Sequence, residues 1–221
     1  NVSSYFSRNR AYSKMGFKDF HDMTGMGLQD IGWGAPDMEV FKYAIKQLDK
    51  QSSPFFYHMI TMTSHGPFTN ARYYHNNSEY DGIKDTVARD YFNSMSYVDS
   101  SLEFFINHIL QNQKNTYVMV LGDHTPSISN DTFRQASYSM DGTYFEFVPL
   151  LLLTPDGKVS KADSISASFL DVAPTLLNAA GISFNYRSDG IDLITKESLR
   201  PIPYKGYTYD RAILFNRMNS Q

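Results

Sequence analysis

The sequence contains no cysteine, which excludes disulfide bonds and metal sites built from thiolates. Its longest apolar runs fall far short of the roughly 20 residues that a membrane-spanning helix needs. Lys and Arg (20) nearly balance Asp and Glu (23), so no basic excess indicates a nucleic-acid partner or an anionic membrane surface. Hydrophobic residues make up 42% and aromatic residues 15% of the chain, which excludes a disordered protein.

The 221 residues are enough to bury a sizeable core, and neither an internal repeat nor a linker divides them. We therefore expect one domain over residues 1–221. Apolar residues at helical spacing predict helices over 37–50, 85–113 and 166–182. Near-continuous apolar runs predict buried strands over 54–63, 115–121 and 144–155. Alternating helices and buried strands indicate an α/β fold with a mainly parallel sheet sandwiched by helices.

One predicted strand ends in an unusual pair of polar residues. In "VMVLGDHTPSIS" (118–129), an apolar run reaches Gly122 and is followed directly by Asp123 and His124. Ligands gather beyond the carboxyl ends of strands in open α/β sheets, and a carboxylate beside an imidazole suits a divalent cation such as Mn²⁺ or Zn²⁺. The alternative is an ordinary turn, with the Asp capping a helix and the His exposed. Two ligands alone do not complete a metal site.

Other polar and aromatic residues also have more than one interpretation. His65 ends a predicted strand and is either a site residue or a solvated turn residue. Arg8 can clamp a phosphate through its planar fork of donors, although it is one Arg among several. His58, inside its predicted strand, is interpreted as a core histidine. Trp33, the only tryptophan, is interpreted as a packing residue, and Asp171 as a helix cap.

Four segments together resemble a known family. They are "YFSRNRAYSKMGFKDFHD", "PFFYHMITMTSHGPF", "VLGDHTPSIS" and "ASFLDVAPTLLNAAGI". Their order and rough spacing are similar to those in the C-terminal part of the lipoteichoic acid synthases and their phosphoglycerol transferase relatives. These enzymes belong to the alkaline phosphatase/sulfatase superfamily. The resemblance covers most of residues 1–195, and little beyond 195 aligns.

The resemblance implies an alkaline phosphatase/sulfatase-like fold whose N-terminal part is missing, so that residues 1–221 form the C-terminal portion of the catalytic domain. It implies a phosphoglycerol transferase or related phosphodiesterase with one divalent metal, Mn²⁺, or Mg²⁺ or Zn²⁺ as alternatives. In this family a metal-bound Thr attacks the phosphodiester. That Thr and a metal-binding Glu would lie upstream of Asn1, which itself falls near a family Asp. The 221 residues alone would then be inactive.

The family's functional residues carry over to single positions of this chain. Asp123 and His124 match the two metal ligands of the "GDH" motif. His65 matches a substrate-contacting His, and Arg8 matches the Arg that holds the phosphate of phosphoglycerol. Phe6 falls where the lipoteichoic acid synthases have a substrate-contacting Trp, so an indole N–H donor is lost at that position.

The resemblance also implies where the protein acts and on what. The parent protein would be anchored in the membrane through upstream helices, with the catalytic domain on the extracellular side of a bacterial cell membrane. The substrate would be a lipid or glycan that bears phosphoglycerol. The missing N-terminal half of the domain would be a structural partner, and no nucleic-acid partner is expected.

Two other classes of function stay open. One is a sulfatase or a phosphoethanolamine transferase. Sulfatases need an upstream Cys or Ser that is converted to formylglycine, and the phosphoethanolamine enzymes commonly carry disulfides, which the absence of Cys disfavours. The other is a non-catalytic module that binds a phosphorylated glycan or a lipid head group. The departures from the family at Phe6 and Asn1 leave room for it.

Overall fold

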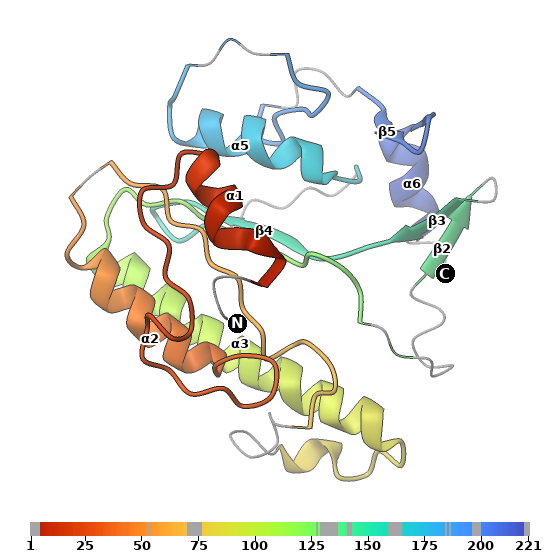
Figure 1. Cartoon of the computed structure of the whole chain (residues 1–221). Helices are drawn as coiled ribbons and strands as arrows, with labels where there is room; N and C mark the ends of the chain where they lie inside the picture. Colours follow the sequence, from red (N-terminus) through yellow and green to blue (C-terminus); the bar gives the residue numbers. More distant parts are fainter. Residues whose placement is uncertain are drawn as a thin grey trace. The chain divides into compact units, whose positions relative to one another are not determined.

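The computed structural model places most of the chain in two compact units, and its elements are labelled in Figure 1. The first unit comprises Asn1–Gln113 and Pro126–Phe133, and the second comprises Lys114–Thr125 and Arg134–Gln221. The structure describes residues 5–52, 54–69, 77–126, 128, 137–140, 143–158, 165–183, 185, 187–195 and 200–218. Asn1 therefore lies outside the described residues.

The described part of the first unit is helical. Its elements are η1 (Tyr5–Ser7), α1 (Arg8–Lys14), α2 (Asp37–Leu48), η3 (Ser78–Tyr80) and α3 (Thr86–Asn112). The helices predicted over 37–50 and 85–113 are confirmed with slightly narrower bounds. α3 begins where it does because the Asp85 carboxylate accepts the backbone N–H groups of Val87 and Ala88 as a cap.

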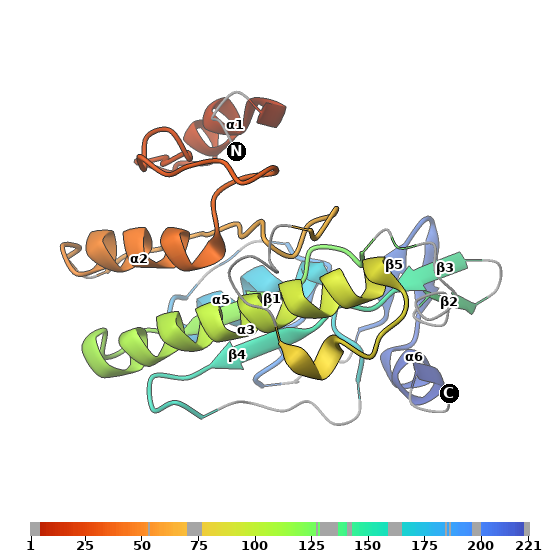
Figure 2. The same ribbon diagram turned by 90° about the horizontal axis from the view of Figure 1, so that it is seen from below.

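The core of the first unit lies between α2 and α3, which run side by side (Figure 2). Phe41 of α2 stacks on Phe105 of α3, with ring centroids 4.9 Å apart. Burial of such aromatic side chains removes a large apolar area from water, which is the main stabilising contribution in a helix pair. Further buried residues of these two helices are Ala44, Ile45, Leu48, Tyr97 and Ile109.

The strand predicted over 54–63 is not present among the described residues. The structure assigns no strand to residues 54–62, although their side chains alternate between exposed and half-buried from Pro54 to Ile60. A strand needs a neighbour that supplies ladder hydrogen bonds, and no described segment pairs with this one. The prediction of a buried strand here is therefore wrong both in pairing and in burial.

The described part of the second unit contains three pairs of strands. β1 (Val118–Leu121) pairs with β4 (Leu150–Leu153), β2 (Ser137–Met140) with β3 (Thr143–Glu146), and β5 (Ile202–Tyr204) with β6 (Tyr207–Tyr209). All three pairs are antiparallel, so the predicted mainly parallel sheet is not found among the described strands. The single strand predicted over 144–155 is two strands, β3 and β4, separated by Phe147–Pro149.

The helix predicted over 166–182 is present in two parts, η4 (Phe169–Asp171) and α5 (Val172–Ala179). Ser168 and Asp171 form a capping box at its start, so the predicted capping role of Asp171 is confirmed. At its end, Gly181 has φ +67° and donates its N–H to Asn178 O, while Ile182 N–H bonds Leu177 O. This is a Schellman arrangement, which closes the helix at Gly181.

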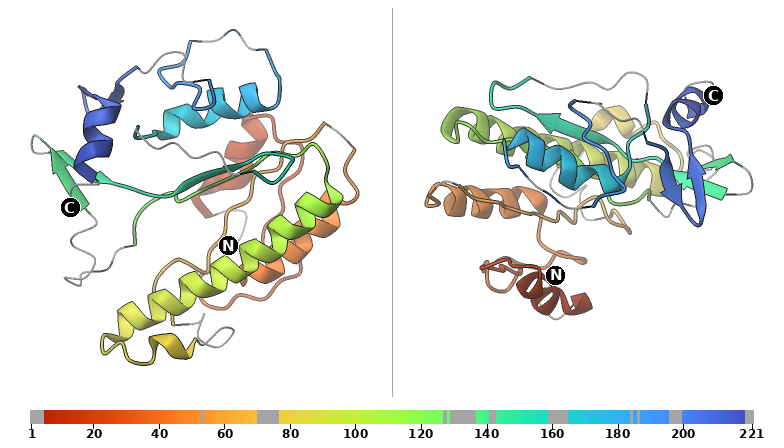
Figure 3. Two further views of the ribbon diagram at one scale, coloured as in Figure 1. Left: turned by 180° about the vertical axis from the view of Figure 1, so that it is seen from behind. Right: turned by 90° about the horizontal axis from the view of Figure 1, so that it is seen from above.

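The C-terminal tail forms a hairpin and a helix that share one small core. α6 (Arg211–Met218) lies beside the β5–β6 hairpin (Figure 3). Ile202, Tyr209 and Leu214 are buried together between them. α6 was not predicted from the sequence.

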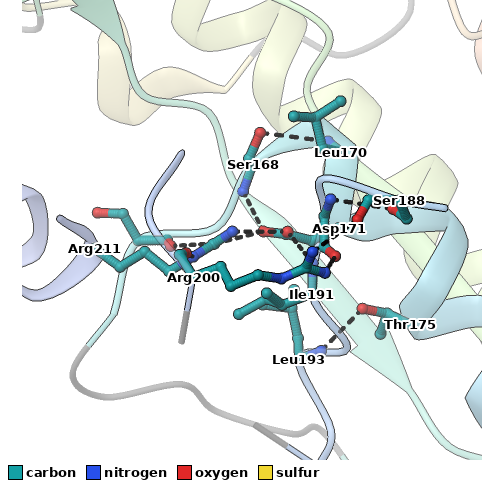
Figure 4. Close-up of polar contacts among 11 residues, drawn as sticks. Ser168, Leu170, Asp171, Thr175, Ser188, Ile191, Leu193, Arg200 and Arg211 are labelled. Atoms are coloured by element: carbon teal, nitrogen blue, oxygen red, sulfur yellow. Dashed lines mark hydrogen bonds and ion pairs between the residues drawn. The ribbon is translucent and has the colours of Figure 1, made fainter. Parts of the chain in front are cut away.

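A buried ion pair joins this tail to α5 (Figure 4). The guanidinium of Arg211 donates two hydrogen bonds to the Asp171 carboxylate, at 2.6 and 2.9 Å. Asp171 also accepts the N–H groups of Ser168 and Ile191, and Arg211 also donates to Ser166 O and Arg200 O. Asp171 is 0% and Arg211 3% exposed, so both charges are fully compensated inside the protein.

We predict that Asp171→Asn destabilises the protein by about 3–5 kcal/mol, because it leaves the Arg211 charge buried without its anion. Urea denaturation followed by circular dichroism measures this loss. The control is Lys42→Ala, which removes the exposed Lys42–Glu39 ion pair on α2 and should cost less than about 1 kcal/mol. Equal effects of the two substitutions would contradict the importance of the buried pair.

Candidate functional site

The turn that carries His65 is held by a buried carboxylate. Asp37, the first residue of α2, is 0% exposed. Its Oδ1 accepts the N–H groups of Met62 at 2.8 Å and Thr63 at 3.0 Å. In return, Thr63 Oγ1 accepts the N–H of Asp37 at 3.0 Å. These three hydrogen bonds fix the start of α2 to the segment directly before His65.

Asp37 is held at an electrostatic cost. Burial raises the pKa of its carboxyl above the ordinary value of 3.8, and the bonds from Met62 and Thr63 oppose that rise without cancelling it. Its second oxygen, Oδ2, has no hydrogen-bond partner among the described residues. A proton on this carboxyl is therefore favoured more in the folded chain than in water.

His65 is exposed, and its ring has a defined orientation. The backbone N–H of His65 donates to Met62 O at 3.0 Å, which closes a turn. Its Nδ1 lies 2.9 Å from Gly66 O, and because a carbonyl only accepts, Nδ1 carries the proton. In the neutral ring the lone pair is then on Nε2. Trp33 stacks on this ring, with centroids 4.4 Å apart and planes at 29°.

An open pocket lies beside the stacked pair. Its lining includes Ile31, Trp33, Met62, His65, Pro67 and Phe68. The lining is mostly apolar, with the imidazole as its titratable group. The hollow is shallow, so a ligand here would contact the exposed surface of these side chains and would not be enclosed by them.

Arg8 is the first residue of α1 and is half-buried. Its guanidinium carbon lies 5.8 Å from the ring centroid of Phe6, a cation–π contact, and Phe6 itself is 76% exposed. The pKa of His58 is lowered, first by partial burial of its ring and second by the nearby charge of Arg8. The interpretation of His58 as a core histidine is wrong, because its side chain is only partly covered, by the rings of Tyr12 and Phe17, and more than a third of its surface is exposed.

Asp123 and His124 follow β1 in the second unit. The preceding Gly122 donates its N–H to Pro149 O at 3.0 Å, and a Cβ on it would meet Val148 Cβ at 2.9 Å. Only glycine therefore fits where β1 ends. The two side chains are largely exposed, 85% for Asp123 and 56% for His124.

The side chains of Asp123 and His124 lie close to one another. His124 Nδ1 donates to Thr125 O at 2.8 Å, which leaves the lone pair of the neutral ring on Nε2. That Nε2 lies 3.9 Å from Asp123 Oδ1. Two ligands bonded at about 2.1 Å in a tetrahedral arrangement lie roughly 3.4 Å apart, so a small adjustment brings both onto one cation. Within the described ranges, no group of three or more His, Asp and Glu side chains is placed to hold a metal.

The chain is a member of a family of enzymes. Residues 2–182 match the model of the family described as Sulfatase. This match covers well over half of the chain, and the chain therefore belongs to the sulfatase family. The family and the mixture of helices and small sheets agree with the predicted α/β class.

The chain is also similar to lipoteichoic acid synthases. It is 28% identical over 99% of its length to the lipoteichoic acid synthase of Staphylococcus saprophyticus and 27% identical over 99% to that of Staphylococcus aureus. To lipoteichoic acid synthase 1 of Bacillus subtilis it is 29% identical over 88% of its length. The expected relationship is confirmed, and it extends beyond residue 195, contrary to the prediction. The chain spans only 32–36% of the length of these relatives.

Two residues of the His65 region were not predicted from the sequence. Asp37 had no assigned role, and Trp33 was interpreted as packing. The signal for both was the segment "IGWGAPD" (31–37), in which two glycines flank the only tryptophan and an acidic residue follows a proline. Separately, no helix in the described part of the chain combines the length and apolar character needed to cross a membrane.

We predict that Asp37 makes the stability of the chain depend on pH in a defined direction. Because its folded pKa is raised, the folded state binds this proton more tightly than the unfolded state. We compare the free energy of unfolding of the wild type with that of Asp37→Asn. The wild-type value minus the variant value should increase as the pH falls from neutral through the raised pKa toward 3.8. Urea titrations at several pH values, followed by Trp33 fluorescence, measure this difference.

The matched control is Glu39→Gln, which removes an exposed carboxylate from the same turn of α2. It should change the free energy of unfolding by less than about 0.5 kcal/mol. A wild-type advantage over Asp37→Asn that shrinks as the pH falls would contradict the raised pKa.

Proposed function

We propose that this chain is part of a metal-dependent phosphoglycerol transferase of the lipoteichoic acid synthase type. The observation that carries the proposal is the alignment with lipoteichoic acid synthases over nearly the whole chain. Because the chain spans about a third of those relatives, the complete reaction is assigned to a longer protein of which it is one portion. In that protein the Thr nucleophile and a further metal ligand precede Asn1, and the 221 residues alone have no transferase activity.

Asp123 and His124 are proposed to hold one divalent cation, Mn²⁺, with Mg²⁺ or Zn²⁺ as alternatives. The support is their donor set: an exposed carboxylate and an imidazole whose Nε2 lone pair is 3.9 Å from it. When bound, the cation would stabilise negative charge that develops on a phosphoryl oxygen. The Thr125 carbonyl keeps the proton on Nδ1 of His124, so the ring does not need to change tautomer to bind.

The first unit is proposed to bind the substrate. Arg8 donates to the phosphate of phosphoglycerol, for which its fork of N–H groups is suited. His65, with its proton on Nδ1, accepts a hydrogen bond from a glycerol hydroxyl through Nε2. Phe6, which is exposed beside Arg8, contributes an apolar face without an N–H donor.

The substrate is proposed to be a lipid or glycan that bears phosphoglycerol, on the extracellular side of the cell membrane of a bacterium, with the longer protein anchored in that membrane. The names of the relatives support this, since lipoteichoic acid is their stated product. The family match favours a sulfatase as the second candidate. A phosphoethanolamine transferase and a non-catalytic head-group-binding module are further alternatives.

We predict that the 221-residue chain binds Mn²⁺ in isothermal titration calorimetry, and that Asp123→Ala and His124→Ala each weaken binding at least about tenfold. The chain offers a matched control in Asp49 and His108, an Asp–His pair with Nε2 and Oδ1 2.9 Å apart. Asp49→Ala and His108→Ala should leave Mn²⁺ affinity unchanged. Binding that survives in both site variants, or is lost in the control variants, would reject the assignment.

Transfer itself is tested on the longer protein with a phosphoglycerol-bearing lipid as donor. We expect release of the lipid alcohol, with loss of turnover in Asp123→Ala and a strong reduction in Arg8→Ala. Release of inorganic sulfate from an aryl sulfate, without phosphoglycerol transfer, would instead establish the sulfatase alternative. Binding of phosphoglycerol without any turnover would establish the non-catalytic one.

A further inference from the structure

We propose that Trp33 is a substrate-binding residue of the His65 pocket, and that its indole face packs against the glycerol carbons of the phosphoglycerol head group. This inference rests on the proposed function for the identity of the ligand. It adds a specificity-determining residue to the groups that hold that ligand.

A tight turn of the backbone positions the Trp33 side chain. Gly32 has φ +133° and Gly34 φ +156°, conformations that residues with a Cβ rarely adopt. The Ile31 N–H closes the turn to Gly34 O at 2.9 Å, and the Gly32 N–H bonds Asp30 Oδ1 at 2.8 Å. Two glycines and two hydrogen bonds thus hold a single large aromatic at the tip of a tight turn.

The side chain of Trp33 is only partly buried. Trp33 is 39% exposed, whereas the four residues that follow it, 34–37, are all buried. The indole faces the imidazole of His65 in a stacked arrangement and forms part of the pocket lining. Part of the indole surface therefore stays in contact with solvent, where a ligand can reach it.

Hydrogen bonds to the buried Asp37 carboxylate support the Trp33–His65 pair. Asp37 lies four residues after Trp33, and its carboxylate binds the backbone of Met62 and Thr63, three and two residues before His65. One buried group therefore ties the start of α2, which follows the Trp33 turn directly, to the segment before the imidazole. A preorganised pair of this kind loses little side-chain entropy when a ligand binds.

The chemistry of the two rings is complementary to a polyol. An indole face offers dispersion contacts to C–H groups, and its edge carries one N–H donor. The neighbouring imidazole offers Nε2 as an acceptor for a hydroxyl proton. Inorganic phosphate has no C–H groups for the indole face. The pair should therefore contribute to binding of glycerol phosphate and not to binding of phosphate alone.

The test uses Trp33 as its own reporter, because it is the only tryptophan in the chain. Glycerol 1-phosphate and inorganic phosphate are titrated into the 221-residue chain, and heat and tryptophan emission are recorded in parallel. We expect glycerol 1-phosphate to change the emission in a saturable manner, with the same midpoint as the heat. Inorganic phosphate should bind with little change in emission.

Three variants test the contact independently of fluorescence. Trp33→Ala should weaken binding of glycerol 1-phosphate roughly three- to tenfold and leave the affinity for inorganic phosphate unchanged. Trp33→Phe, which keeps an aromatic face, should recover most of the loss. Tyr207→Ala is the control, since it removes a 66% exposed aromatic from the other unit and should change neither affinity.

The outcomes separate the inference from the proposed function. Heat on addition of glycerol 1-phosphate without a change in emission overturns the role of Trp33 and leaves the proposed function intact. Equal weakening of both ligands in Trp33→Ala also overturns it, because a purely structural role would act on both. Absence of heat with either ligand overturns the proposed substrate, and the inference with it.

Discussion

A carboxylate that is removed from water must be supplied with hydrogen-bond donors, and this constraint organises both units of the chain. In the first unit, Asp37 is fully buried and takes its donors from the backbone of Met62 and Thr63, which ties the start of α2 to the turn before His65. In the second unit, Asp171 is satisfied by Arg211 and by backbone N–H groups, which ties α5 to the C-terminal tail. Each buried charge joins segments that are distant in the sequence.

The Asp171 and Asp37 carboxylates differ in how many of their oxygens have hydrogen-bond partners. The difference corresponds to the segments that each carboxylate joins. Asp171 has a guanidinium and two N–H donors on its two oxygens, as expected of a purely structural clamp. Asp37 leaves one buried oxygen without a partner among the described residues and has a raised pKa. The less complete site lies directly behind the candidate binding pocket, where local instability is commonly tolerated for function. At the pocket surface, a neighbouring carbonyl sets the tautomer of His65, as Thr125 O does for His124.

Much of the local structure was predictable because it depends on neighbours in the sequence. The helices over 37–48 and 86–112, the capping role of Asp171 and the glycine at the end of α5 follow from apolar periodicity and capping chemistry. The strand over 54–63 and the mainly parallel sheet were not correct for the described residues, because strand pairing is a contact between distant segments. α6 was missed because eight residues are too few to show a clear helical period, and because its stability comes from burial against the β5–β6 hairpin.

The sequence by itself determined which side chains are available for chemistry and which local segments carry them. These are the Gly-Asp-His that follows β1, the His before Gly-Pro, and the Arg near the start of the chain. It also determined family membership, since motif order survives at 27–29% identity. Only the tertiary structure decided that Trp33 lies on His65, that Asp37 ties the start of α2 to the segment before His65 and that His58 is not a core residue. These are relations between side chains far apart in the chain, and no local pattern of residues encodes their distance.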